Sequence, residues 1–254
     1  MLAILAPGQG SQTPGMLTAW LEDAELKNLL TSYSSAINLD LERLGTVADA
    51  DEIKDTANAQ PLIVATSLIS AYALGSNVKT SFVAGHSVGE IAAAALAATL
   101  TELDAMKLVH LRGQEMAKAA ALAPAGMSAV LGGERSVVLA AIKELGLVAA
   151  NDNGAGQIVA AGNLDALSQL APEGARVRAL AVAGAFHTPF MEPAVAPLRV
   201  MAKTIETSDA KISVISNRDG AVVRDGREVL DRIVNQIANP VRWDLCMQTL
   251  REQG

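Results

Sequence analysis

The sequence predicts an α/β protein, with a large domain around a mainly parallel sheet and a small subdomain inserted into it. Half of the 254 residues are hydrophobic, which is enough for a sizeable core. Short apolar runs alternate with longer helical patterns, an order that gives parallel strands covered by helices. The alternation changes near residues 124–126 and resumes near residue 190. We therefore expect a large domain over residues 1–125 and 187–254, and a small one over 126–186.

The large domain is expected to open with a buried strand over residues 2–6, which Pro7 and Gly8 stop. A helix is expected over 61–74, because Pro61 suits a first helical position and apolar residues surround the whole helix. The further elements expected in this domain are strands over 82–84 and 212–216 and helices over 89–98, 104–121, 190–205 and 227–237.

The inserted subdomain shows a different order of elements. We expect a strand over 127–131, a helix over 136–145, strands over 148–151 and 157–161, a helix over 164–170 and a strand over 176–182. Strand-helix-strand-strand-helix-strand is the ferredoxin-like order.

Composition excludes several classes of function. The net charge is −7 and no stretch concentrates Lys and Arg, so neither nucleic acid nor an anionic membrane surface is an expected partner. Cys246 is the single cysteine, which fits a reducing cytoplasm, and no cluster of Cys and His has metal-site spacing. Residues 1–6 lack the positive charge of a secretory signal. Residues 81–100 have only Glu90 as a certain charge, but two glycines with a His and a Ser in their middle favour a buried strand-turn-helix over a membrane span. We expect a cytoplasmic monomer without a metal or cofactor.

The strongest chemical motif is G-x-S-x-G at residues 85–89, directly between an expected strand and an expected helix. In that context it predicts a nucleophile elbow, which holds the Ser87 hydroxyl out at the carboxyl end of the strand and makes the large domain α/β-hydrolase-like. The N-terminal amides of the next helix point to where an oxyanion would form. The alternative is a Gly-rich turn that contains a serine by chance.

A serine nucleophile needs a base, and the chain offers three histidines. His187 lies where the chain leaves the small subdomain, and a junction between domains is a usual place for a cleft. A turn or capping role is its alternative. His86 adjoins Ser87 and points elsewhere in an elbow, so we expect it to pack, and His110 lies mid-helix. Arg112, on an otherwise apolar helix face, fits an ion pair or a carboxylate clamp equally well.

Several motifs together resemble the malonyl-CoA:acyl-carrier-protein transacylases and the related acyltransferase domains of polyketide synthases. The motifs that carry the resemblance are Pro7–Gln12, Gln60-Pro61, Gly85–Glu90, Arg112-Gly113, Asn153–Gly162, Gly184–His187 and Gln236–Trp243. They run in the family's order. The chain departs from it at Val88, where many relatives have Leu, and at Gly254, past which relatives usually continue with another strand and a helix. We therefore expect either an incomplete chain or the loss of part of the core.

The resemblance implies the catalytic roles. Ser87 would be the nucleophile and His187 its base, while the backbone amides of Gln9 and Val88 would form the oxyanion hole. A backbone carbonyl at Gln236 would orient the histidine in place of a carboxylate.

The resemblance also implies the substrate. Arg112 would bind the free malonyl carboxylate, and Gln60 and Asn153 would line the pocket. The reaction would be ping-pong transfer of malonyl from malonyl-CoA to acyl carrier protein, for type II fatty acid or related lipid or polyketide synthesis. The rival interpretations are a serine hydrolase or thioesterase, for which a buried Arg112 has no use, and a non-catalytic subunit that docks acyl carrier protein.

Overall fold

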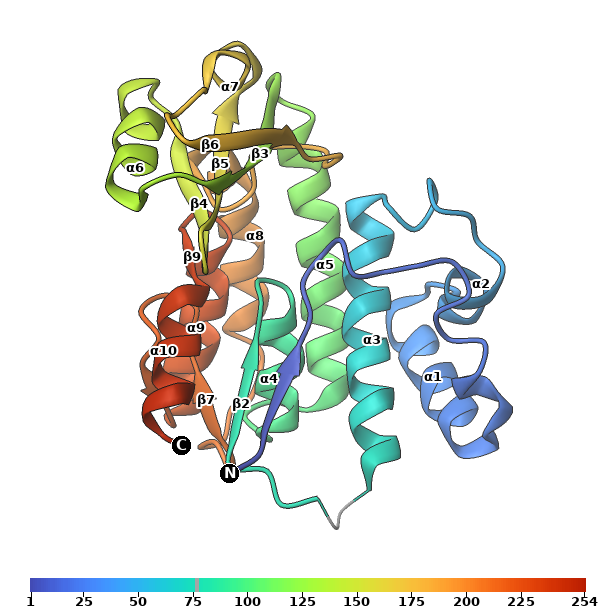
Figure 1. Cartoon of the computed structure of the whole chain (residues 1–254). Helices are drawn as coiled ribbons and strands as arrows, with labels where there is room; N and C mark the ends of the chain where they lie inside the picture. Colours follow the sequence, from blue (N-terminus) through green and yellow to red (C-terminus); the bar gives the residue numbers. More distant parts are fainter. Residues whose placement is uncertain (76–77) are drawn as a thin grey trace.

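A computed structural model describes residues 1–75 and 78–254, and two β-sheets organise them (Figure 1). The first sheet has the strand order β1-β2-β7-β8 and the second the order β6-β3-β5-β4-β9. In Figure 1 the second sheet lies beyond the upper ends of β1 and β2, which are their carboxyl ends. The predicted strands and helices are therefore both present, in a mixed α/β fold with parallel strands.

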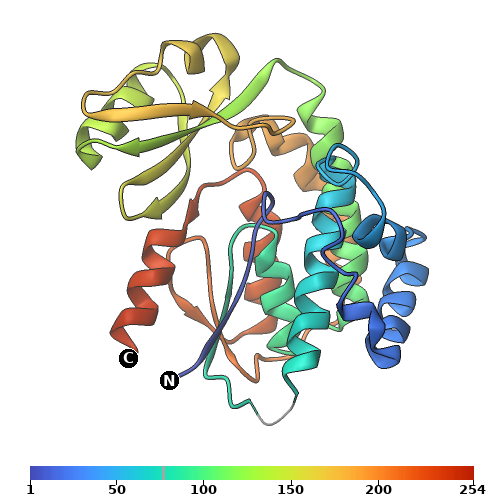
Figure 2. The ribbon, with the colours of Figure 1, turned by 45° about the vertical axis from the view of Figure 1, so that its right-hand side comes forward.

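The first sheet is parallel except at one edge. Its strands are β1 (Ala3–Ala6), β2 (Phe82–Gly85), β7 (Ser213–Ile215) and the antiparallel β8 (Val222–Val223). Its residues alternate between two buried faces: Val83 and Val214 belong to the main core, whereas Ala84 and Ile215 pack against Cys246 of α10 (Trp243–Glu252). Figure 2 shows the same layering, with α10 in red on one side of the sheet and the blue and green helices on the other.

The helices around this sheet form the bulk of the molecule. They are η1 (Trp20–Glu22), α1 (Ala24–Ile37), α2 (Leu41–Thr46), α3 (Thr56–Leu74), α4 (Gly89–Leu96), α5 (Glu102–Ala120), η2 (Pro189–Met191), α8 (Glu192–Ala202) and α9 (Gly226–Gln236). Among them, η1, α1 and α2 were not expected from the sequence, and neither was α10. None of the helices in the described residues is long and apolar enough to cross a membrane.

The predicted start of the helix at Pro61 was wrong, because α3 begins at Thr56 and contains Pro61. Asp55 caps this earlier start by accepting a hydrogen bond from the backbone N–H of Ala57 (2.8 Å). Proline removes one backbone donor within the helix, and the helix tolerates this loss while its apolar side chains, Leu62 and Ile63 among them, are fully buried.

The second sheet carries helices on one face only. Its elements are β3 (Ala125–Gly132), α6 (Arg135–Glu144), β4 (Val148–Gly154), β5 (Gln157–Asn163), α7 (Leu164–Gln169), β6 (Ala175–Ala179) and β9 (Val241–Arg242). Alternate residues of β3 face opposite sides: Val130 packs in the cluster that holds Val138 of α6 and Leu167 of α7, while Met127 and Ala129 line a cavity on the other side. β9 pairs in parallel with β4, so this sheet recruits a strand from beyond residue 187.

Candidate active site

Ser87 lies in the turn between β2 and α4, with φ at 53°, a left-handed value that a non-glycine residue adopts only under strain. The flanking glycines make the turn possible. A Cβ on Gly85 would overlap the backbone of Gly89, and a Cβ on Gly89 would overlap the carbonyl oxygens of Ala6 and Pro7. The predicted elbow is therefore present, and it sets the serine hydroxyl at the carboxyl edge of the first sheet.

His187 follows β6 and meets Ser87 across 100 residues of sequence. Its Nε2 lies 2.7 Å from Ser87 Oγ, and its Nδ1 lies 2.8 Å from the carbonyl oxygen of Gln236. A carbonyl can only accept, so Nδ1 carries the hydrogen and Nε2 is left as the acceptor facing the hydroxyl. Burial, and next the charge of Arg112, lower the pKa of His187 to about 3, so the ring is neutral at physiological pH.

Arg112 reaches the same point from α5. Its Nη2 donates to Gln236 Oε1 (3.0 Å) and lies 3.4 Å from Ser87 Oγ, while Nη1 donates to Gln60 Oε1 (2.7 Å). The side chain is 1% exposed, and within the described residues its Nε has no acceptor. Burial lowers the pKa of Arg112 to about 10, opposed by the charge of Glu90, so the guanidinium remains charged beside the serine. The sequence left open an ion pair or a carboxylate clamp for Arg112, and within residues 1–75 and 78–254 no carboxylate forms a direct ion pair with it.

A cavity of about 220 Å³ opens over Ser87 and His187. One wall comes from the turns after β1 and β2, through Gln9 and Ser87, and from His187 after β6. The other wall comes from the inner face of the second sheet, through Met127 and Asn153. Neither the Gln9 nor the Val88 backbone N–H has a hydrogen-bond acceptor within residues 1–75 and 78–254. Two backbone donors near a hydroxyl can stabilise a developing oxyanion.

The other predicted residues take distinct places. Asn153 lines the cavity, whereas Gln60, 1% exposed, lies behind it against Arg112. His86 packs edge-on against Trp243, with ring centroids 5.4 Å apart, and its Nε2 lies 2.9 Å from Asn153 Oδ1. His110 contacts Gln114 on α5 and takes no part in the site.

Sequence reasoning missed Glu90 and Asn217. Asn217 Oδ1 accepts from the backbone N–H of Ser87 (2.8 Å), and Glu90 Oε1 accepts from the backbone N–H of Asn217 (2.8 Å). Burial raises the pKa of Glu90 to about 7, although its hydrogen bonds oppose the shift. A signal for Glu90 was present in the sequence: it is the only Asp, Glu, Lys or Arg in residues 81–100, and a charge inside so apolar a stretch requires buried partners.

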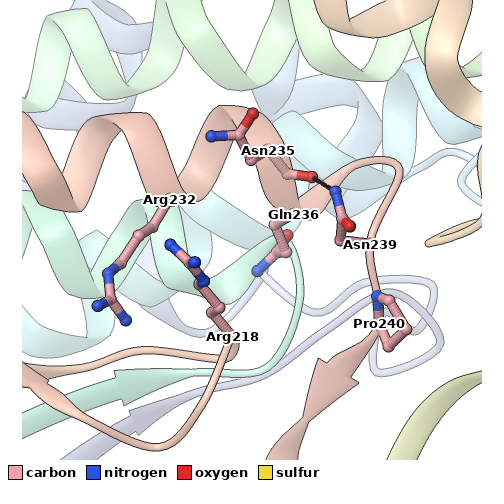
Figure 3. A pocket seen from close by; sticks show the side chains of 6 residues that line it. All are labelled: Arg218, Arg232, Asn235, Gln236, Asn239 and Pro240. Atoms are coloured by element: carbon pink, nitrogen blue, oxygen red, sulfur yellow. Dashed lines mark hydrogen bonds between the residues drawn. The ribbon is translucent and has the colours of Figure 1, made fainter.

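A second cavity, of about 270 Å³, lies at the end of α9 (Figure 3). Arg232, in its wall, donates to Asp219 and Glu228 (2.7 Å each), and Asn239 closes the turn after α9 by donating to the carbonyl oxygen of Asn235 (2.8 Å). Gln236 also lines this cavity, so it contributes both to this wall and to the surroundings of Arg112.

Comparison with known proteins identifies the family. The family model described as "Acyl transferase domain" matches residues 4–254. The chain belongs to the acyl transferase domain family. A relative from Mycobacterium tuberculosis named malonyl CoA-acyl carrier protein transacylase is 53% identical over 99% of this chain and 86% of its own length.

Solved structures of similar acyl transferases agree with the fold. The crystal structure of MCAT from Mycobacterium tuberculosis superposes with a TM-score of 0.95 at 52% identity, covering 98% of this chain and 85% of that one. A malonyl-transacylase solved in complex with a type II PKS acyl-carrier protein has a TM-score of 0.91 at 28% identity, covering 99% of this chain and 85% of that one.

Proposed function

We propose that this acyl transferase moves the malonyl group of malonyl-CoA to the phosphopantetheine thiol of an acyl carrier protein, for type II fatty acid or related lipid or polyketide synthesis. One observation carries the proposal: the buried Arg112 guanidinium lies 3.4 Å from Ser87 Oγ, which in turn lies 2.7 Å from His187 Nε2. A guanidinium beside the nucleophile suits an acyl group that ends in a carboxylate. The names of the similar transacylases support the same substrate and carrier.

The reaction proceeds in two half-reactions. Ser87 Oγ attacks the thioester carbonyl as its proton passes to His187 Nε2, and the backbone amides of Gln9 and Val88 stabilise the oxyanion. The C–S bond then breaks, and His187 returns the proton to the departing CoA thiolate. The carrier thiol attacks the malonyl-Ser87 ester by the same steps, with its proton taken up by His187 and given back to Ser87. These groups account for every proton and charge, so the proposal calls on no metal or cofactor.

Substrate binding also changes the pKa of the base, His187. The charge of Arg112 is the second cause that lowers the pKa of His187. A malonyl carboxylate on Arg112 neutralises that charge, so the pKa of His187 rises when the correct substrate is bound. A neutral acetyl group leaves Arg112 uncompensated and His187 a weaker base.

We propose that the two sheets correspond to two units, a large α/β-hydrolase-like one over residues 1–125 and 187–254 and a small ferredoxin-like one over 126–186. The antiparallel order β6-β3-β5-β4 supports the second description, while β9 ties the units together. We further propose a cytoplasmic monomer, and the single buried Cys246 fits a reducing compartment.

Intact mass spectrometry tests the proposed function. The protein is exposed briefly to malonyl-CoA, its mass is measured, and holo acyl carrier protein is then added. We expect a malonyl adduct that persists in water, disappears on addition of the carrier, and does not form in Ser87→Ala. An adduct that water removes at once would favour a hydrolase, and a wild-type chain that forms none would favour a non-catalytic subunit.

A further inference from the structure

The proposed reaction makes no use of Glu90, yet this carboxylate lies close to its centre. Glu90 is in the first turn of α4 and is 2% exposed. Its Oε2 accepts from Gln236 Nε2 (2.5 Å) and its Oε1 from the backbone N–H of Asn217 (2.8 Å). A buried carboxylate with two strong donors is an anchor for the groups that donate to it.

The first of these groups is the Gln236 amide, which joins Glu90 to Arg112. Its Nε2 faces Glu90, and its Oε1 accepts from Arg112 Nη2 (3.0 Å). A flipped amide would set NH₂ against the guanidinium and oxygen against the carboxylate, so only one orientation satisfies both charges. The backbone carbonyl of the same residue accepts from His187. Glu90 therefore fixes a residue that touches both the base and the buried cation.

The second group is Asn217, which holds the strained nucleophile. Its Oδ1 accepts from the backbone N–H of Ser87 (2.8 Å), and its Nδ2 donates to the carbonyl of Gly85 (2.7 Å). Gln236 Nε2 lies 3.1 Å from the carbonyl oxygen of Ser87. Both peptide groups of a residue with φ at 53° are thus held by side chains from distant segments.

We propose that Glu90, Asn217 and the Gln236 side chain are positioning residues, which hold the Ser87 backbone, the carbonyl that orients His187 and the Arg112 guanidinium in one fixed arrangement. The inference rests on the proposed function, because it assigns these residues to the acylation of Ser87. It also gives the Gln236 side chain a role beyond that of its backbone carbonyl.

The ionised form of Glu90 is the one that accepts both hydrogen bonds and offsets the charge of Arg112. The titratable groups that interact with it are Arg112 on α5 and Cys246 on α10, while His187 after β6 is joined to it through Gln236. His187 stays neutral down to about pH 3, and burial raises the pKa of Cys246 to about 12, so neither titrates near neutrality. Acylation should therefore weaken as pH falls through about 7, where Glu90 takes up a proton.

The experiment measures single-turnover acylation of Ser87 by malonyl-CoA in the full chain, quenched and read by intact mass. We compare wild type, Glu90→Gln, Gln236→Ala and the double variant at pH 8, with Glu206→Gln as the matched control because Glu206 is exposed on a loop. We expect each single variant to lose about 100-fold in rate, the size that a small misplacement of reacting groups causes, and the double variant to lose hardly more. Glu206→Gln should keep the wild-type rate.

Two further readouts separate positioning from mere folding. The acid limb near pH 7 should vanish in Glu90→Gln, and cooperative unfolding in urea at pH 8 should show that this variant is folded. Losses that multiply in the double variant, or an acid limb that persists in Glu90→Gln, would overturn the proposal. If Glu90→Gln does not fold, the Gln236→Ala variant tests the proposal by itself, and a loss in its acylation rate below about threefold overturns the proposal. If the wild type is acylated and the variants react at the same rate, only the positioning role is refuted. If the wild type is not acylated at all, the proposed function is refuted.

Discussion

At the scale of single residues, the proposed choice of acyl group rests on Arg112. Its guanidinium is held by the amide oxygens of Gln60 and Gln236, both neutral acceptors, so its charge has no direct anionic partner in the described residues. An unpaired buried cation is costly, and a carboxylate that pairs with it recovers part of that cost. The proposed preference for malonyl over acetyl therefore rests on a guanidinium that has no direct anionic partner in the described residues.

The first prediction is that Arg112→Ala changes the substrate preference. We expect kcat/KM for malonyl-CoA to fall by about 30-fold to several thousand-fold, the cost of truncating one partner of a buried charge pair. The kcat/KM for acetyl-CoA should fall little or even rise, because removing the cation also raises the pKa of His187. Steady-state kinetics with both substrates measures this, and Arg112→Lys should be intermediate. Equal losses for both substrates would mean that Arg112 only supports the fold.

At the scale of elements, the turn from β2 to α4 depends on close backbone approach. Gly89 is the first residue of α4, and a Cβ there would lie 2.6 Å from the carbonyl oxygen of Pro7 and closer still to that of Ala6. The end of β1 and the start of α4 are thus packed backbone to backbone. This packing brings the turn after β1, which holds Gln9, next to the turn that holds Ser87.

The second prediction concerns this contact. Gly89→Ala should lower the free energy of unfolding by about 1–3 kcal/mol through overpacking, although alanine favours a helix, and should reduce acylation of Ser87. Urea unfolding measures the first effect and the mass assay the second. Gly126→Ala in β3 is the control, because its Cβ would come close only to the side chain of Leu164, which is 51% exposed, and would make an ordinary contact with Leu167 at 3.8 Å. That variant should change stability by less than about 0.5 kcal/mol. Equal effects of the two substitutions would refute the close-packing argument.

At the scale of the whole molecule, the site exists because two sheets meet. His86 of the first sheet's turn lies 2.9 Å from Asn153 of the second, and the backbone N–H of Arg242 in β9 donates to the carbonyl of Asn217 (2.7 Å). Glu90 and His187 are both buried near this meeting of the sheets, and Gln236 contacts each of them. Their opposite pKa shifts therefore enter the stability of the entire fold.

The third prediction is a pH dependence of unfolding with opposing contributions. The pKa of Glu90 is raised from 4.5 to about 7, so Glu90 contributes stability that is lost as pH rises through that range. The pKa of His187 is lowered from 6.5 to about 3, so its contribution to stability is lost as pH falls below 6.5. Between pH 4.5 and 6.5 these two contributions change the free energy of unfolding of the wild type in opposite directions.

Two variants separate these slopes. On acidification from pH 6.5 to 4.5, Glu90→Gln should lose stability more steeply than wild type, and His187→Gln should gain relative to wild type, each by up to about 3 kcal/mol. Urea unfolding at several pH values provides the free energies. Parallel curves for wild type and both variants would contradict the assigned shifts.

Much of the site could be predicted because its signals are local. The glycines around Ser87 act within five residues, and the strand and helix patterns on either side need no distant partner. The helix boundary at Pro61 was wrong for a related reason: proline at a first position is a local preference, and burial of the flanking residues overrode it.

By itself, then, the sequence determined the alternating strands and helices, the elbow and the candidate nucleophile and base. The resemblance to the family implied that the Gln236 carbonyl orients the base, and the structure brings the two groups together. Only the tertiary structure decided which side chains hold that arrangement. The carbonyl that meets His187 is 49 residues away, and every residue has such a carbonyl, so no residue type marks it. Glu90 and Gln236 are 146 residues apart, and Asn217 reaches Ser87 across 130. Contacts of this range arise from the packing of sheets and helices, and a side chain's role in them follows from its burial and partners.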